Sequence, residues 1–328
     1  MTTATPDQPD GRKDLWDLVT VGEAMALFMG SPAAPLRPGS QVTFSFAGAE
    51  SNVAIGASRL GHRVAYVSRI GDDHMGRTIL GALASEGVDV GGVHRDDQAP
   101  TSLMVRQHRT ADLITVDYYR REGAGRRLSP GDIDPKIIEG SRLLHLSGIT
   151  PSLSETACEA TLYAASVAVG AGVPVSLDIN HRAQMWSEDE AGRALRKLLP
   201  SVDILFGSPA ELLLVEQADS AEEAAQRLRE RGIGQVVLKR GSQGASLWHA
   251  GGRVDLPAVP VTAVDPVGAG DAFVAGYLSA FLDQTGTEDR LRRAVSCGAF
   301  AVSVHGDWEG TPHRDELELI GLKEQVQR

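Results

Sequence analysis

Short apolar segments alternate with helical patterns along most of the chain, and this alternation constrains the fold more than any other feature. Buried-type strands are expected at residues 15–22, 62–71, 141–148, 173–179, 202–207 and 234–241. Helical patterns lie between them at residues 49–61, 74–87, 152–170, 187–200 and 220–232. Strands that alternate with helices pair in parallel, and right-handed crossovers place the helices on both faces of the sheet. The sequence therefore predicts an α/β fold with a mostly parallel central sheet.

Two of the expected helices carry a local start signal. Ser187 and Ser220 each precede a glutamate by three residues, Glu190 and Glu223. In this spacing the hydroxyl and the carboxylate each accept a backbone N–H group of the first turn. We therefore expect a capping box at the start of both helices.

Two segments interrupt the alternation. Residues 24–47 have strand-like ends around a Pro/Gly-rich middle, and residues 101–120 resemble two strands joined by the sequence RTAD. Neither segment has room for a crossover helix, so we expect both to form a small antiparallel lid beside the main domain. Exposed strand edges usually need covering, so two copies of the chain would pair through their lids as a homo-oligomer.

Length, charge and composition limit the class of protein. The 328 residues suffice for one large domain, expected over residues 15–328, after a polar, disordered tail at residues 1–14. The formal charge of −11 argues against nucleic acid as a partner, and no long apolar stretch predicts a membrane span. The two cysteines fit neither a disulfide framework nor a metal-ligand spacing, and the tail lacks a signal peptide's apolar core. A cytoplasmic protein with a small-molecule partner is expected.

The segment VDPVGAGDAFVAGYLSAFL, residues 264–282, carries the strongest chemical signal. A Gly-x-Gly turn opens a long apolar helix, so the backbone N–H groups of Gly268, Ala269 and Gly270 have no partners within the helix. These donors and the helix dipole favour an anion such as phosphate. Asp271 follows directly, and a carboxylate beside an anion site suits a general base that takes a proton from an attacking hydroxyl. The alternative is a plain glycine turn with Asp271 as a capping acid.

The start of that segment resembles the C-terminal signature of the ribokinase-like (PfkB) sugar kinases, whose usual pattern is D-T-x-G-A-G-D. Three more segments match in the family's order: FAGAESNVAIGASRLG (46–61), RIGDDHMGR (69–77) and VVLKRGSQGA (236–245). The resemblance implies a ribokinase-like three-layer sandwich and an ATP-dependent kinase with Asp271 as the base. Pro266 stands where the family usually has Thr, which leaves the backbone donors of the turn intact.

Within the family, the segments GAESN, YYRREGAG, LHLSGITPSLS and LDINHRAQMW are most similar to 2-keto-3-deoxygluconate kinases. The resemblance places Gly48 and Asn52 in the sugar pocket. It places Tyr118 and Arg120 over that pocket on the lid, and Arg182 at the end of a strand. Guanidinium groups pair with carboxylates through two parallel hydrogen bonds. The implied reaction is therefore phosphorylation of the sugar acid 2-keto-3-deoxygluconate at its terminal hydroxyl, unless these arginines are merely solvated.

The resemblance also implies a site for ATP and Mg²⁺. Nucleotide contacts would come from several loops: Asn180, Arg182, Lys239, Gly241, Gly244, Gly268 and Gly270. Glu211, in the segment SPAE, would hold Mg²⁺ through water, although Ser208 replaces the family's common Asn and an exposed helix acid is the alternative. Relatives hold a monovalent cation near the position of Asp265, and the sequence leaves such an ion open.

Other functions remain as alternatives. Met104 stands where the kinases named above often have Tyr, which removes a hydroxyl from the pocket. A fructokinase, a ribokinase or another keto-sugar kinase therefore remains open. A nicotinamide-dependent oxidoreductase would share the strand–helix alternation, but no G-x-G-x-x-G motif follows the first strand. A non-catalytic sugar sensor is the third class, against which the intact Asp271 and glycine turn argue.

Overall fold

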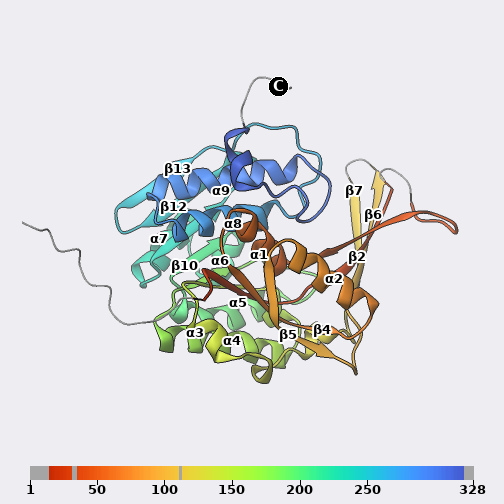
Figure 1. Cartoon of the computed structure of the whole chain (residues 1–328). Helices are drawn as coiled ribbons and strands as arrows, with labels where there is room; N and C mark the ends of the chain where they lie inside the picture. The colour runs from red at the N-terminus through yellow and green to blue at the C-terminus, as the bar shows by residue number, and fades with distance from the viewer. Residues whose placement is uncertain (1–14, 32–34, 111–112, 321–328) are drawn as a thin grey trace, which may run out of the picture.

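The computed structural model describes residues 15–31, 35–110 and 113–320 (Figure 1). The tail expected at residues 1–14 lies outside these ranges. Nine strands form the main sheet, in the spatial order β13 (Gly252–Leu256), β12 (Ala245–His249), β11 (Gln235–Lys239), β10 (Ile204–Gly207), β9 (Val175–Asp178), β8 (Leu144–Ser147), β1 (Leu18–Val21), β4 (Val64–Gly71) and β5 (Val88–Asp96). All neighbouring pairs from β5 to β11 are parallel, and β12 and β13 extend that edge antiparallel.

Helices cover both faces of this sheet. One face packs against α3 (Pro135–Glu139), α4 (Glu155–Ala171), α5 (Glu188–Leu198), α6 (Pro209–Val215) and α7 (Ala221–Glu230). The other face packs against α1 (Ala49–Arg59), α2 (His74–Ser85), α8 (Ala269–Leu282) and α9 (Thr287–Val302). The molecule is therefore a three-layer α/β/α sandwich, and the predicted fold class is confirmed.

The reason for the two-sided core is visible along single strands. In β10, Leu205 packs into the core on the α4 side, whereas Ile204 and Phe206 pack into the core on the α8 side. All three side chains are fully buried. Successive side chains of a strand point to opposite faces, so a strand covered on both sides must be apolar throughout. Each such burial contributes about 1.5–3 kcal/mol of favourable free energy.

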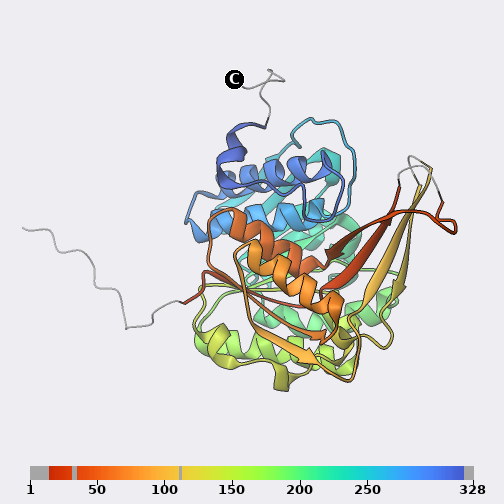
Figure 2. The ribbon, with the colours of Figure 1, turned by 45° about the vertical axis from the view of Figure 1, so that its right-hand side comes forward.

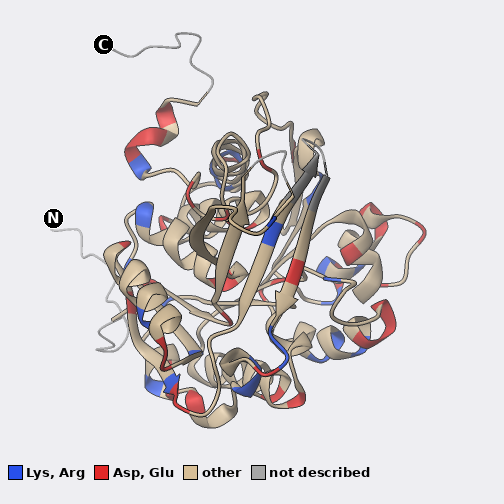
Figure 3. Cartoon of the chain, turned by 90° about the vertical axis from the view of Figure 1, so that its right-hand side faces the viewer, with Lys and Arg blue, Asp and Glu red and all other residues tan. Residues whose placement is uncertain are grey.

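The two segments that interrupt the alternation meet in a separate four-stranded sheet, which we call the lid. Its spatial order is β3 (Val42–Ala47), β2 (Met25–Gly30), β6 (Leu103–Thr110) and β7 (Leu113–Tyr119). The sheet stands beside the main body (Figure 2), and its strands carry few charged residues compared with the surrounding helices (Figure 3). Part of the expected RTAD connection, residues 111–112, lies outside the described residues.

One expectation for the lid was wrong. A purely antiparallel sheet was predicted, but the central pair β2–β6 is parallel, while β2–β3 and β6–β7 are antiparallel. Two antiparallel pairs from distant parts of the chain lie side by side, and their inner strands run in the same direction. The outer surface leaves Val42, Phe44 and Tyr119 exposed, and the pairing of two lids remains a prediction.

The capping box that the sequence predicts is complete at the start of α5, but only its serine half forms at the start of α7. At α5, the Ser187 hydroxyl and the Glu190 carboxylate form the full capping box. At α7, Ser220 accepts the Glu223 N–H, but the Glu223 carboxylate accepts the N–H of Asp219 instead of that of Ser220. Among the described helices, none combines the length and the apolar character that crossing a bilayer requires.

Candidate active site

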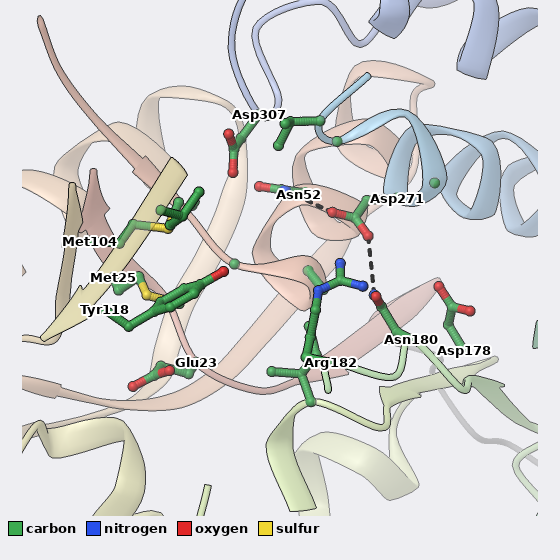
Figure 4. Close-up of a pocket in the computed structure, with 18 of the residues that line it drawn as sticks. Glu23, Met25, Asn52, Met104, Tyr118, Asp178, Asn180, Arg182, Asp271 and Asp307 are labelled. Carbon is green, nitrogen blue, oxygen red and sulfur yellow. Dashed lines mark hydrogen bonds between the residues drawn. The ribbon is translucent and has the colours of Figure 1, made fainter. Parts of the chain in front are cut away.

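Two cavities open near the carboxyl ends of the central parallel strands. The first, which we call the charged cavity, has a volume of about 450 Å³ and lies between the lid and the main sheet. Five acidic and four basic side chains line it: Glu23, Asp178, Glu211, Asp271, Asp307, Arg106, Arg120, Arg182 and Lys239. Figure 4 shows this cavity with Asp271 and Asn180 on one side and the lid residues on the other.

The second cavity, which we call the glycine-rich cavity, has a volume of about 590 Å³. Its walls are small or apolar, with Gly241, Gly244 and Ala269 on one side and Gly298 of α9 on another. Lys239 is the one ionisable side chain among its described lining residues. The two cavities share Lys239, Pro266 and Gly270, so they meet at the turn that begins α8.

That turn has the geometry that the Gly-x-Gly sequence predicts. Gly268 is the N-cap of α8 with a left-handed φ of 75°. A Cβ on Gly268 would lie 1.7 Å from the carbonyl oxygen of Asp307, so the close approach of these two loops also requires glycine. The first N–H groups of α8 have no acceptor within the helix. The junction of the two cavities is therefore suited to an anion.

Asp271, in the first turn of α8, lies beside this junction and is 9% exposed. Its Oδ2 accepts a hydrogen bond from Asn52 Nδ2 (2.8 Å), and its Oδ1 accepts one from Asn180 Nδ2 (3.5 Å) (Figure 4). Burial raises the pKa of Asp271, while the Asn52 hydrogen bond and the Arg182 charge lower it, and the net pKa is above the ordinary value. A buried carboxylate held by two amides in this way is poised to accept a proton.

Lys239, at the end of β11, lies between the two cavities. Its Nζ donates to both carboxylate oxygens of Asp178, at 2.6 and 2.8 Å. Burial lowers the pKa of Lys239, but the charges of Asp178 and Glu211 outweigh this effect and the net pKa is raised. The ammonium group therefore stays charged at the point where an anion would pass from one cavity to the other.

Glu211 is held mainly by backbone groups. Its Oε1 accepts the N–H of His181 (2.8 Å), and its Oε2 accepts the N–H of Ser208 (2.7 Å) in a capping box that starts α6. Burial raises the pKa of Glu211, but the Lys239 charge and these N–H groups lower it by more. The net pKa is below the ordinary value, so the carboxyl is ionised. Each oxygen keeps a lone pair beyond these bonds, so the group lines the cavity as a fixed negative charge.

Arg120 follows the last lid strand and is buried against the cavity. One of its terminal nitrogens, Nη2, donates to Glu23 Oε2, and Glu23 Oε1 accepts the Ser102 hydroxyl at 2.7 Å. The Arg120 guanidinium also lies 5.5 Å from the ring centre of Tyr118. Sequence reasoning missed Glu23, although it directly follows the first strand and Gly22, at the edge of the sheet where such folds bind ligands.

The lid contributes an apolar wall to the charged cavity. Met25 of β2, Met104 of β6 and Val116 of β7 line it, and Met25 and Met104 belong to one small buried cluster. Figure 4 shows Met25, Met104 and Tyr118 grouped across the cavity from Asp271. Arg182, which is exposed, extends into the cavity from the loop after β9.

The structure brings together every residue that the sequence singled out for the site. The charged cavity is lined by Gly48, Asn52, Tyr118, Arg120, Asn180, Arg182, Glu211, Lys239, Gly268, Gly270 and Asp271. The glycine-rich cavity takes Lys239, Gly241, Gly244, Ala269 and Gly270. Gly48 is needed because a Cβ there would lie 2.2 Å from the carbonyl oxygen of Glu23.

Sequence reasoning missed further lining residues. Asp178 and Arg106 carried usable signals, since Asp178 ends a buried strand and Arg106 lies two residues after Met104, on the same face of β6. Asp307 carried no local signal. The loop residues at 258–263 that line the glycine-rich cavity also follow no pattern.

The turn at residues 265–270, which we call the anion-binding turn because its geometry suits an anion, the buried carboxylate of Asp271 beside it and the two cavities that meet there suit the transfer of a phosphoryl group between two ligands. A family model described as pfkB family carbohydrate kinase matches residues 17–314, and the chain belongs to that family. The protein is therefore a phosphotransferase that moves a phosphoryl group onto an alcohol group of a carbohydrate.

Relatives and solved structures are similar to this chain over nearly its whole length. The chain is 32% identical to a 2-dehydro-3-deoxygalactonokinase of Haloferax volcanii, over 93% of this chain and 96% of that protein. It is 33% identical to a 2-dehydro-3-deoxygluconokinase of Bacillus subtilis, over 92% and 94%. A rice Fructokinase-1 is 30% identical, over 96% and 99%. A structure from E. coli, described as a Ribokinase II in complex with ATP and Mg²⁺, superposes with a TM-score of 0.86 at 27% identity, covering 93% of this chain and 99% of that one.

Proposed function

We propose that this kinase phosphorylates 2-keto-3-deoxygluconate at its terminal hydroxyl. The observation that carries the proposal is the Arg120 guanidinium, which is buried at the charged cavity with hydrogen-bond donors to spare. Among the described residues its Nε has no acceptor, and its Nη1 reaches only the sulfur of Met185, at 3.3 Å. An unpaired buried donor costs about 1–3 kcal/mol, which a substrate carboxylate at this position would offset.

Asp271 is the general base in this proposal. The hydrogen bonds from Asn52 and Asn180 hold its carboxylate in one orientation, and the base takes the proton from the terminal hydroxyl as that oxygen attacks. The N–H groups of Gly268, Ala269 and Gly270 would stabilise negative charge on the transferred phosphoryl group. Gly48, Asn52 and Tyr118 would line the sugar pocket.

The nucleotide would lie in the glycine-rich cavity, where Gly241 and Gly244 form the turn after β11. ATP with Mg²⁺ supplies the phosphoryl group and a cation that neutralises the phosphate charge. The residues present fit a metal held largely by phosphates and water, because the described residues form no cluster of three metal ligands, and the Glu211 carboxylate offers the oxygen ligand that Mg²⁺ prefers. Asn180, Arg182 and Lys239 would contact the phosphates.

The apolar wall of the lid supports a deoxy sugar acid over a fully hydroxylated ketose. The substrate would extend from Asp271, at its reacting hydroxyl, towards Arg120, at its carboxylate. Its middle carbons then face Met25 and Met104, which offer no strong hydrogen-bond partner. A hydroxyl against such a wall loses about 1–3 kcal/mol, whereas the methylene at C3 loses nothing.

The test is a coupled assay of ADP release with a panel of acceptors. We expect the highest kcat/KM for 2-keto-3-deoxygluconate, with its C4 epimer next and fructose and ribose far behind. An equal or higher kcat/KM for fructose would overturn the sugar-acid assignment and make the protein a ketose kinase. A monovalent cation near Asp265 is checked in the same assay by exchanging K⁺ for tetramethylammonium.

A further inference from the structure

Arg106 of the lid strand β6 is one of the most deeply buried charged side chains in the described molecule, at 1% exposed. Its Nη1 donates to Asp307 Oδ1 at 2.8 Å, and its Nη2 lies 3.5 Å from Asp265 Oδ2. Both carboxylates are buried as well. A single guanidinium from the lid therefore neutralises two acids that belong to the main domain.

Both acids shape the turn that begins α8. Asp265 Oδ1 accepts the N–H of Val267 at 3.1 Å, and Asp265 Oδ2 accepts the N–H of Gly306 at 3.4 Å. The carbonyl oxygen of Asp307 lies against Gly268, where no side chain would fit. The positions of these acids thus set the backbone geometry of the anion-binding turn.

A second lid contact reaches the same loop. The Ser45 hydroxyl of β3 donates to Glu309 Oε1 at 2.6 Å, and Glu309 Oε2 accepts the N–H of Asp307 at 2.8 Å. The ring of Phe46, also in β3, lies 5.0 Å from that of Trp308. The loop at residues 306–309 is therefore held between the lid and the turn, with the Arg106 ion pair at its centre.

We infer that Arg106 is a positioning residue that couples the lid to the anion-binding turn. By pairing with Asp307 and Asp265 it fixes the loop against which the turn packs, and it removes negative charge that would oppose a phosphoryl group there. An unpaired buried carboxylate is costly and moves towards solvent or takes up a proton. Burial already raises the pKa of Asp307 to about 7 although Arg106 opposes the shift. The inference rests on the proposed reaction at this turn, and not on which sugar is accepted.

The test is a double-mutant cycle with Arg106→Met and Asp307→Asn, using the best acceptor of the panel. We expect Arg106→Met to lower kcat by about 10- to 100-fold, the scale of a 1 Å misplacement, with a smaller change in KM for the sugar. Asp307→Asn, added to Arg106→Met, removes the unpaired charge and should recover at least half of that loss on a logarithmic scale. If Arg106→Met does not fold, the neutral but polar Arg106→Gln replaces it in the same cycle.

The matched control is Arg69→Met. Arg69 of β4 also joins two carboxylates, Asp96 at 2.8 Å and Asp132 at 3.1 Å, but lines neither cavity. This variant should lose stability and keep its kcat. If the double variant loses as much kcat as Arg106→Met alone, the inference is overturned. A loss confined to KM for the sugar would also overturn it, because Arg106 would then bind substrate directly.

A failure of the substrate assignment can be distinguished from a failure of this inference. If fructose proves the best acceptor, the cycle is run with fructose and its expected outcome is unchanged. Hydrogen exchange gives a readout that needs no sugar: the backbone amides at residues 305–310 should exchange faster in Arg106→Met than in Arg69→Met, and slow again in the double variant. No recovery in the double variant would again overturn the coupling.

Discussion

The glycine-rich cavity and the charged cavity meet at one turn but are built in opposite ways. The first is lined by three stretches of the C-terminal part of the chain, at residues 239–244, 258–273 and 295–302, mostly through small and apolar groups. The second draws nine acidic and basic side chains from residues 23–307, many of them paired with one another. The first cavity is therefore suited to recognise a ligand by shape and backbone groups, and the second by charge. Substitutions in the glycine-rich cavity should therefore change the kinetics equally for all acceptors. Substitutions in the charged cavity should change kcat/KM for some acceptors more than for others.

The largest expected effect is at the turn that the cavities share. Asp271→Asn keeps the size of the side chain but cannot accept the proton, so kcat should fall by about 100- to 10,000-fold while ATP affinity changes little. Steady-state kinetics and calorimetric titration with ATP measure the two quantities. Asp289→Asn is the control, because Asp289 is an exposed acid in the first turn of α9. More than about a tenth of the activity in Asp271→Asn would mean that Asp271 only caps its helix.

Arg120→Leu tests whether the charged cavity separates acceptors. A hydrogen bond to a charged group contributes about 1.5–3 kcal/mol, so kcat/KM for the keto acid should fall by roughly 10- to 150-fold. The value for fructose should change little, because fructose has no carboxylate. Since Arg120→Leu leaves Glu23 unpaired, the same comparison is made in the double variant with Glu23→Gln. Equal losses for both acceptors would show that Arg120 supports the lid instead of binding the acid.

Gly298→Leu tests the other half of the comparison. Gly298 of α9 lines the glycine-rich cavity, and a larger side chain there takes up space that the nucleotide needs. If the larger side chain costs about 1 kcal/mol or more of binding free energy, KM for ATP should rise by roughly 5-fold or more. The rise should be the same whichever acceptor is used. A rise that depends on the acceptor would mean that the two cavities do not recognise their ligands independently.

The smallest expected effect is a shift in the pH profile. The base works deprotonated, so activity is lost as pH falls through the pKa of Asp271, which burial raises. The Arg182 charge lowers that pKa, so Arg182→Gln should move the acid limb of kcat/KM to higher pH. Arg193→Gln, an exposed arginine of α5 outside both cavities, should leave the limb in place. A shift in the opposite direction would contradict Asp271 as the titrating base.

The turn at which the two cavities meet could be predicted from the sequence, because its parts are contiguous. The Gly-x-Gly turn, its helix and Asp271 lie within a few residues, and their geometry follows from local backbone rules. The layers could also be predicted, since strand and helix periods are local patterns. For the charged cavity, the sequence and its resemblance pointed to Arg120 and Arg182, which line it, but not to what pairs with the arginines there.

The tertiary structure alone decided those partners. The pair Glu23–Arg120 joins residues 97 positions apart, and the pair Arg106–Asp307 joins residues 201 apart. The parallel pairing of β2 with β6, which lie far apart in the chain, was decided in the same way. Which charges meet, and how much solvent they lose, depends on how the lid docks on the main sheet. The sequence by itself determined the alternating layers and the anion-binding turn, because these depend on neighbouring residues. The charge pattern of the cavity arises only when distant segments are buried together.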